Sequence, residues 1–237
     1  MSRFPACQRG LSLIELMVAL AISSFLILGI TQFYIDDRSS FLFQQGQVNN
    51  LDKSRFANLL LEQLLSRVGY RTEPWQSMDI SFPVISASNG CPAFAAGETL
   101  LRNTAGNGIC MRYQAANDEA NAGLDCFGEA ATSDADVLLN IHYDSAVGTL
   151  NCQIADASAV LVDDVNRFVF SDIPERDDEN QSIRFAVLLS NGANLRGGVS
   201  SDVLERWNSL SGEQLATDSP QTFQIVQGSV MLRNLMP

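Results

Sequence analysis

The stretch GLSLIELMVAL, residues 10–20, places one carboxylate, that of Glu15, at the start of an apolar run. The run extends from Leu11 to Ile35, and Glu15 is its only charge. As a helix it would measure roughly 37 Å at about 1.5 Å per residue, enough to cross the hydrocarbon core of a bilayer. The rival is a cleaved secretory signal, whose apolar part is about 7–15 residues long and ends at a small-residue site. The closing sequence LILGITQFYIDD (26–37) has no such site, so we predict a transmembrane helix over 11–35.

The flanking charges indicate how that helix is oriented. Residues 1–10 contain Arg3 and Arg9 and no acid, whereas the whole chain has 15 basic and 27 acidic side chains, a net charge of −12. A basic start before an apolar run keeps the N-terminus in the cytoplasm and sends the following chain outward. The acidic balance argues against a broad basic face, so nucleic acid is not an expected partner.

The helical pattern continues beyond the apolar run. No proline occurs over 36–68, and Gly46 is the only interior glycine of that stretch. We therefore predict that 36–69 continues the helix as an amphipathic segment, capped by Gly69, and that Pro74 prevents further continuation. The apolar face expected to pack on a globular head consists of Val48, Leu51, Phe56, Leu59, Leu60, Leu64 and Val68.

The chain from residue 70 to 237 has a different sequence pattern, in which short runs of residues typical of β-strands alternate with clusters of Gly, Asn, Asp and Ser. A turn-like SAVG joins 136–144 to 148–155, which indicates a hairpin. The sequence 201–215 has the composition of a short helix in a polar connection. The pattern predicts an α+β fold, a long helix packed on an antiparallel sheet; the other expected strands are 80–86, 108–115, 159–172, 182–191 and 222–234.

The five cysteines are Cys7, Cys91, Cys110, Cys126 and Cys152. Cys7 precedes the apolar run, so it does not form a lipoprotein signal, and four cysteines remain if residues 1–10 are removed. The other four fit two disulfides in an exported domain, and the absence of a CxxC pair argues against zinc. Nearness in sequence favours Cys91–Cys110 with Cys126–Cys152, each stabilising by about 3 kcal/mol. The crossed pairing, Cys91–Cys152 with Cys110–Cys126, remains an alternative.

Catalysis is not expected from this sequence. His142 is the only histidine, so any Ser–His–Asp or Cys–His arrangement would require it. It alternates with Ile141 and Tyr143 in an expected strand, which is typical of a residue on a sheet face. Paired acids such as Asp163–Asp164 are common at strand ends, and the nucleophile, nucleotide and metalloprotease motifs are absent. We expect no cofactor.

An acidic cluster, Asp177, Asp178 and Glu179, lies in DIPERDDENQ (172–181). Its oxygen ligands are of the kind that bind Ca²⁺, but the run lacks the alternating ligands and central glycine of an EF-hand loop. We interpret it as a solvated acidic turn, with a calcium site as the alternative and no other metal expected.

The N-terminal stretch closely resembles the class III signal of type IV pilins and type II secretion pseudopilins. The resemblance implies that prepilin peptidase cuts between Gly10 and Leu11 on the cytoplasmic side and removes Met1–Gly10. It also implies that Leu11 is N-methylated and that Glu15, the fifth mature residue, contacts other subunits during assembly. The α-amino group of Leu11, in the same chain or a neighbour, is the expected partner of Glu15. A pair of unit charges about 4 Å apart contributes roughly 4 kcal/mol at an effective dielectric constant of 20.

The resemblance extends to the head. SRFANLLLEQLLSRVGYR (54–71) is similar to the helix end of PilW-type minor pilins and GspJ-type pseudopilins. The segments ICMRYQ, DCFG, LNCQI, LVDDVNRFVF, RFAVLLS and VMLRN follow in the order found in PilW-like proteins. The resemblance implies a pilin fold, in which 11–35 is the filament-core helix and 70–237 a periplasmic head. It further implies other minor and major pilins as partners, and a location in the inner membrane before assembly into a surface pilus.

These observations favour a minor pilin that takes part in priming pilus assembly and is incorporated in the filament or at its tip. The alternatives are a GspJ-like minor pseudopilin of type II secretion and a membrane-tethered binding or enzymatic ectodomain. Residues 190–220 match no segment of the resemblance. We expect Trp75 and Trp207 to be packing residues, with a partner interface as the alternative for Trp207 because it lies in that unmatched region.

Overall fold

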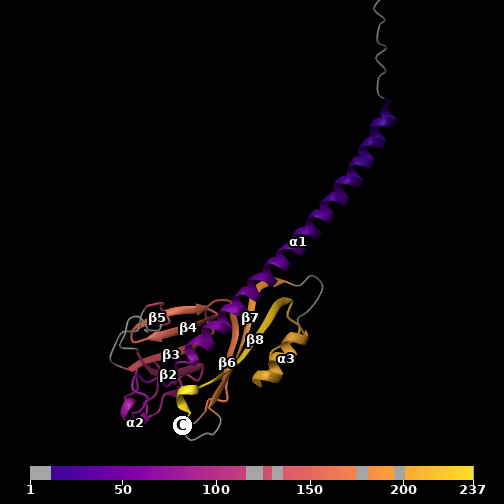
Figure 1. Ribbon diagram of the computed structural model, residues 1–237. Helices are drawn as coiled ribbons and strands as arrows, with labels where there is room; N and C mark the ends of the chain where they lie inside the picture. Colours follow the sequence, from indigo (N-terminus) through magenta and orange to yellow (C-terminus); the bar gives the residue numbers. More distant parts are fainter. Residues whose placement is uncertain (1–11, 116–124, 130–135, 175–180, 195–200, 237) are drawn as a thin grey trace, which may run out of the picture. The chain divides into compact units, whose positions relative to one another are not determined.

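The computed structural model describes residues 12–115, 125–129, 136–174, 181–194 and 201–236 (Figure 1). The chain divides into two compact units, residues 1–45 and 46–237. The helix α1, Leu13–Leu65, begins in the first unit and ends in the second. In the first unit, every side chain from Ser12 to Ile35 is exposed. From here on, the head means this second unit, residues 46–237, and therefore includes the end of α1.

Within the head, α1 buries a face that differs from the expected one. Its buried residues are Gly46, Asn50, Ser54, Ala57, Leu61, Leu64 and Leu65, followed after the helix by Val68. Val48, Leu51, Phe56 and Leu59 were expected in the interface but are 42–66% exposed. The error arose because the periodicity was assigned from the large apolar residues alone, whereas Gly46, Asn50, Ser54 and Ala57 also belong to the buried face. At Gly228 of the sheet, an added Cβ would lie 2.9 Å from Oδ1 of Asn58 on α1, which leaves no room for a larger side chain.

A five-stranded antiparallel sheet forms one side of the head. Its strands are β1 (Leu100–Arg102), β2 (Gly108–Gln114), β3 (Asp136–Asp144), β4 (Thr149–Ile154) and β5 (Ala157–Val162), and they neighbour one another in chain order. The hairpin expected from SAVG is confirmed, because β3 pairs with β4 from Asp144 opposite Thr149. Gly108 is required at the β2–β3 contact, since a Cβ there would lie 2.0 Å from the carbonyl oxygen of Ile141.

A three-stranded antiparallel sheet forms the other side, in the order β6 (Val165–Ser171), β7 (Ser182–Asn194) and β8 (Gln221–Met231). The expected single sheet is therefore wrong, and so is the single strand over 159–172. That run is divided between β5 of one sheet and β6 of the other. The break falls at Asp164, whose φ of 56° is left-handed and ends the extended backbone.

The expected strand over 80–86 is also absent. A short helix, α2 (Met78–Ser81), occupies its start, and only isolated bridges follow, between Ile85 and Phe94 and between Ser88 and Cys91. Pro83 explains the error because it lacks the N–H group that a central strand needs.

One large core lies between α1 and both sheets, and strand β7 is buried on both of its faces. Phe185, Val187 and Leu189 belong to the core shared with α1. Ala186 and Leu188 point to the opposite face, as the two-residue period of a strand requires. There the helix α3 (Ser201–Ser211) covers the three-stranded sheet with Leu204 and Trp207. The expected helix in 201–215 is confirmed, and it covers the second face of this sheet (Figure 1).

The end of α1 is capped from the C-terminus of the chain. Gly69 has a φ of 69°, as the predicted cap requires. Nδ2 of Asn234, in the 3-10 helix η1 (Arg233–Leu235), donates to the carbonyl oxygens of Ser66 and Val68 at 3.0 and 3.1 Å. These bonds satisfy carbonyl groups that a helix end leaves without partners.

Candidate functional site

The first functional element is the apolar, exposed part of α1. Its helix is long and apolar enough to cross a membrane, and none of its most apolar 18-residue window is buried in the structure. Leu13, Phe25 and Phe33 are among the most exposed apolar residues of this segment. A helix of this composition with no protein around it is suited to a bilayer or to other apolar helices.

The hydroxyl groups of Ser23, Ser24 and Thr31 in this segment are satisfied within the helix itself. Ser23 donates to the carbonyl oxygen of Ala19 at 2.7 Å, Ser24 to that of Ala21 at 2.8 Å, and Thr31 to that of Ile27 at 2.8 Å. Satisfying polar groups inside one helix is what hydrocarbon requires, because it offers no water as a partner. The first polar group beyond the segment is Asp36, whose carboxylate accepts a hydrogen bond from Gln32 at 3.2 Å.

Glu15 lies in the first turn of α1 and is exposed. A carboxylate in the first turn of a helix interacts favourably with the positive end of the helix dipole. Gly10 and Leu11, the expected cleavage site and methylation site, lie outside the described residues. The roles of Gly10, Leu11 and Glu15 stay predictions.

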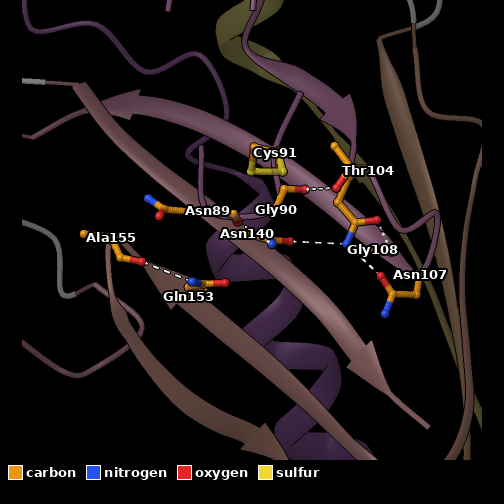
Figure 2. Close-up of a disulfide and its surroundings, with 11 residues drawn as sticks. Asn89, Gly90, Cys91, Thr104, Asn107, Gly108, Asn140, Gln153 and Ala155 are labelled. Carbon is orange, nitrogen blue, oxygen red and sulfur yellow. Dashed lines mark hydrogen bonds between the residues drawn. A yellow bond between two sulfur atoms is a disulfide. The ribbon is translucent and has the colours of Figure 1, made fainter. Parts of the chain in front are cut away.

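The second functional element is the pair of disulfides in the head, Cys91–Cys110 and Cys126–Cys152. Their Cα atoms are 5.7 and 6.4 Å apart. These are the pairs that nearness in sequence favoured. Figure 2 shows the first bridge near Asn140 of β3 and near Thr104 and Asn107 of the connection between β1 and β2. Nδ2 of Asn140 donates to the carbonyl oxygen of Asn89 at 2.9 Å. The bridge and this bond hold the 89–91 turn against the five-stranded sheet.

The candidate catalytic and metal groups do not converge in the described part of the chain. His142 is half-buried on β3, opposite Gly108, and its Nδ1 has no hydrogen-bond partner among the described residues. No group of three or more His, Cys, Asp or Glu side chains suited to a metal ion occurs in the described ranges. Asp177, Asp178 and Glu179, the calcium alternative, lie outside them.

The paired acids Asp163 and Asp164 bind Lys53 of α1. Its Nζ lies 2.8 Å from Oδ1 of Asp163 and also contacts Oδ2 of Asp164. The hydrogen bond from Lys53 lowers the pKa of Asp163 below its usual value. Burial alone would lower the pKa of Lys53, but the hydrogen bonds and charges of the two aspartates raise it. The pair therefore joins α1 to the β5–β6 turn.

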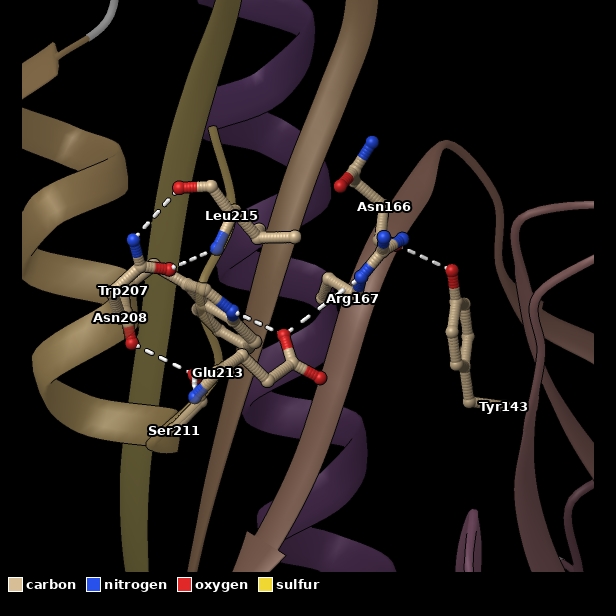
Figure 3. Close-up of polar contacts among 8 residues, drawn as sticks. All are labelled: Tyr143, Asn166, Arg167, Trp207, Asn208, Ser211, Glu213 and Leu215. Atoms are coloured by element: carbon tan, nitrogen blue, oxygen red, sulfur yellow. Dashed lines mark hydrogen bonds and ion pairs between the residues drawn. The ribbon is translucent and has the colours of Figure 1, made fainter. Parts of the chain in front are cut away.

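The two tryptophans have opposite environments. Trp207, a residue of α3, is fully buried against the three-stranded sheet, as expected of a packing residue, and its Nε1 donates to Glu213 at 2.9 Å (Figure 3). Arg167 of β6 lies 3.8 Å from the same carboxylate. The expectation that Trp75 is a packing residue is wrong, because 79% of it is exposed. Trp75 is flanked by Pro74 in a loop, and no periodic pattern there indicated which way the side chain points.

Arg112 is the residue that sequence reasoning missed. It is fully buried on β2, and its guanidinium lies 5.3 and 5.5 Å from the ring centroids of Phe82 and Phe94. It donates to Asp136 at 2.6 Å and to the carbonyl oxygens of Pro83 and Glu98. An arginine in a strand of otherwise apolar residues, ICMRYQ, was the available signal, because a buried charge requires partners.

One comparison with known proteins agrees with the N-terminal motif. Residues 5–31 match the model of the prokaryotic N-terminal methylation motif. Among solved structures, a type IV-like pilin from Thermus thermophilus aligns with a TM-score of 0.45 and 15% identity, over 78% of this chain and 98% of that one. No curated protein matches. The chain thus carries the methylation motif of prokaryotic prepilins, and its long N-terminal helix packs on antiparallel sheets as the resemblance implied.

Proposed function

We propose that this chain is a minor pilin of the PilW type that takes part in priming type IV pilus assembly and is incorporated in the filament or at its tip. The observation that carries the proposal is the succession of Gly10, Leu11 and Glu15, within a matched prepilin motif, at the start of a helix whose side chains from Ser12 to Ile35 are all exposed. This helix fits an anchor in the inner membrane before assembly.

The assembly step follows from the charge at Glu15. Prepilin peptidase is the processing enzyme in this proposal. Its cleavage after Gly10 creates a new α-amino group at Leu11, four residues before Glu15. A carboxylate in an apolar environment costs several kcal/mol unless it is paired. The amino group of Leu11, in the same chain or a neighbouring pilin, provides that pair when the apolar helices pack in register. The chain's function is then assembly and interaction with other minor and major pilins.

The exposed face of α1 in the head supports the same proposal. Val48, Leu51, Phe56 and Leu59 are held on a helix whose opposite face is buried against the sheets. Apolar side chains displayed in this way are suited to contact neighbouring pilin subunits.

Processing provides the first test. In cells with prepilin peptidase, mass spectrometry should find a mature chain that begins at N-methylated Leu11, and Gly10→Val should leave residues 1–10 attached. A wild-type chain that keeps its leader in the presence of the peptidase would contradict the proposal.

Glu15→Leu provides the second test, with Gln32→Leu as a control elsewhere on the same helix. We expect Glu15→Leu to remain processed but to be lost from sheared pili, and Gln32→Leu to be incorporated normally. Equal incorporation of the Glu15 variant would exclude the assembly role.

A deletion strain without surface pili but with normal secretion would favour the pilus over a type II secretion apparatus, and the reverse phenotype would favour secretion.

A further inference from the structure

The segment that follows α1 displays three large apolar side chains that are mostly exposed. Trp75, Ile80 and Val84 are 79%, 69% and 70% exposed, and all three lie within ten residues of chain. Pro74 and Pro83, beside them, are also exposed. Single exposed apolar residues are ordinary, but several gathered on one short loop mark an interaction site. We call Trp75, Ile80 and Val84 the loop patch.

The ends of this loop are brought together by one side chain. Oε1 of Gln114, at the end of β2, accepts hydrogen bonds from the backbone N–H and the hydroxyl group of Thr72 at 3.0 and 3.1 Å. Nε2 of the same Gln114 donates to the carbonyl oxygen of Ser81 at 2.9 Å. Because Thr72 and Ser81 both bond to this one amide, residues 73–80 form a segment whose two ends are held together and whose last turn is α2 (Met78–Ser81). Trp75 and Ile80 therefore lie within one short, closed segment.

The remaining backbone of the loop is also fixed. Arg71 donates to the carbonyl oxygen of Gln76. Beyond α2, Phe82 is fully buried under Arg112, which donates to the carbonyl oxygen of Pro83 at 2.9 Å. Val84 follows Pro83 directly, so this anchor holds the third member of the loop patch in place. Apolar side chains on a rigid backbone lose little conformational entropy on binding, which favours a stable complex.

Charge identifies the kind of partner. Residues 46–237 contain 12 basic and 24 acidic side chains, so the head carries a net charge of −12. The loop itself contains the acids Glu73 and Asp79 and the base Arg71, so it too has an excess of negative charge. Two copies of this head would repel one another, whereas a surface with an excess of Lys and Arg would be attracted. Tryptophan is one of the residue types in which binding hot spots are enriched.

We propose that the loop patch is the docking site for a different protein, whose apolar contact surface is bordered by basic side chains. The proposal rests on the proposed function, because it names the surface through which this pilin-like chain binds a partner subunit. It differs from the helix contacts of that function, which use α1.

The test places a photocrosslinking side chain in the full-length protein in cells that produce its natural partners. Trp75→p-benzoylphenylalanine puts the crosslinker in the loop patch, and Val147→p-benzoylphenylalanine is the matched control, since Val147 is an apolar residue of similar exposure, 73%, in the β3–β4 turn. We expect an adduct with one other polypeptide from position 75, at least tenfold more abundant than from position 147. Mass spectrometry should locate the crosslink in a sequence with an excess of Lys and Arg.

Two further variants examine the contact itself. Adding Ile80→Ser and Val84→Ser to the crosslinker at 75 should reduce the adduct at least tenfold, whereas Val160→Ser, an exposed apolar residue of β5, should not change it. Raising the salt concentration to 0.5 M in isolated membranes should lower the yield several-fold, because salt screens attraction between exposed charges.

Several results would overturn the proposal: equal adducts from positions 75 and 147, an adduct made of two copies of this chain, insensitivity to the serine substitutions, or a yield that salt does not lower. The N-terminal mass is measured in the same samples. A processed chain that gives no adduct at 75 refutes the docking site alone, whereas a chain that retains its leader refutes the proposed function.

Discussion

The two sheets of the head have their outer faces covered in different ways. Over the five-stranded sheet, the chain before β1 is held by the Cys91–Cys110 bond and by Arg112 between two phenylalanine rings. Over the three-stranded sheet, the cover is α3, held mainly by Trp207. The segment before β1 has little regular structure and is held on its sheet by a covalent bond and a buried ion pair. The regular helix α3 is held on its sheet by one large apolar side chain. Each cover should therefore respond to a different substitution.

The largest effect is expected at the three-stranded sheet. Trp207→Ala should lower the free energy of unfolding by about 3–5 kcal/mol, because it removes a fully buried side chain and leaves a cavity. Urea denaturation of the full-length protein in detergent, followed by circular dichroism, measures the change. Trp75→Ala is the matched control and should cost less than about 1 kcal/mol. Similar losses for the two variants would contradict the burial of Trp207.

Removing the covalent bond over the five-stranded sheet should have the next largest effect. Cys91→Ala with Cys110→Ala should cost about 3 kcal/mol, the loop-closure value for two residues 19 apart in sequence. The same urea titration measures it, and peptide mapping without reductant should still find Cys126–Cys152. An unchanged denaturation midpoint would show that the remaining contacts hold this cover.

Breaking the buried ion pair should cost somewhat less. Arg112→Met keeps an apolar stem between Phe82 and Phe94 but leaves Asp136 without its cation, at a cost of about 2 kcal/mol, since Asp136 retains some exposure. Arg184→Met, which breaks the exposed pair of Arg184 with Asp172, is the control and should change stability by less than about 0.5 kcal/mol. Equal losses of stability in the two variants would mean that burial does not make the Arg112–Asp136 pair more important than an exposed one.

The smallest effect concerns Lys53, which links α1 to the turn between the two sheets. The folded pKa of Asp163 lies below its unfolded value, so its contribution is present above about pH 4 and is lost as the pH falls further. The raised pKa of Lys53 preserves the pair until strongly alkaline pH. Lys53→Met should therefore cost less than about 1 kcal/mol at pH 7, because Asp163 is largely exposed, and less again at pH 3, where Asp163 is becoming protonated. Thermal melting of the wild type and of Lys53→Met at both pH values measures this cost in stability. A cost that is equally large in acid would mean that the substitution acts through packing and not through the ion pair.

Sequence patterns predicted the elements that depend on local signals. The long helix, its cap at Gly69, the β3–β4 hairpin and the helix within 201–215 each have a periodicity or a turn composition that is visible in a short window. The two disulfide pairs follow from nearness along the chain. The prepilin motif is also local, because the distance from Gly10 to Glu15 is counted in residues.

Features that depend on the packing of distant segments were not predictable in this way. The face of α1 that packs on the sheets contains Asn50 and Ser54, which hydrophobicity alone assigns to solvent. The division of 159–172 into β5 and β6 depends on which sheet each half joins. Exposure of Trp75 depends on Gln114, 39 positions away, which closes its loop by bonds that no sequence pattern shows.

The opposite environments of the two tryptophans give this protein a spectral property of its own. Trp207, sealed in an apolar cluster, should fluoresce at short wavelengths, whereas Trp75, in contact with water, should fluoresce at long wavelengths and be accessible to a soluble quencher such as iodide. The emission of the folded chain is therefore a sum of two separable components. One reports whether α3 remains seated on its sheet, and the other reports the environment of the loop after α1, without any added label.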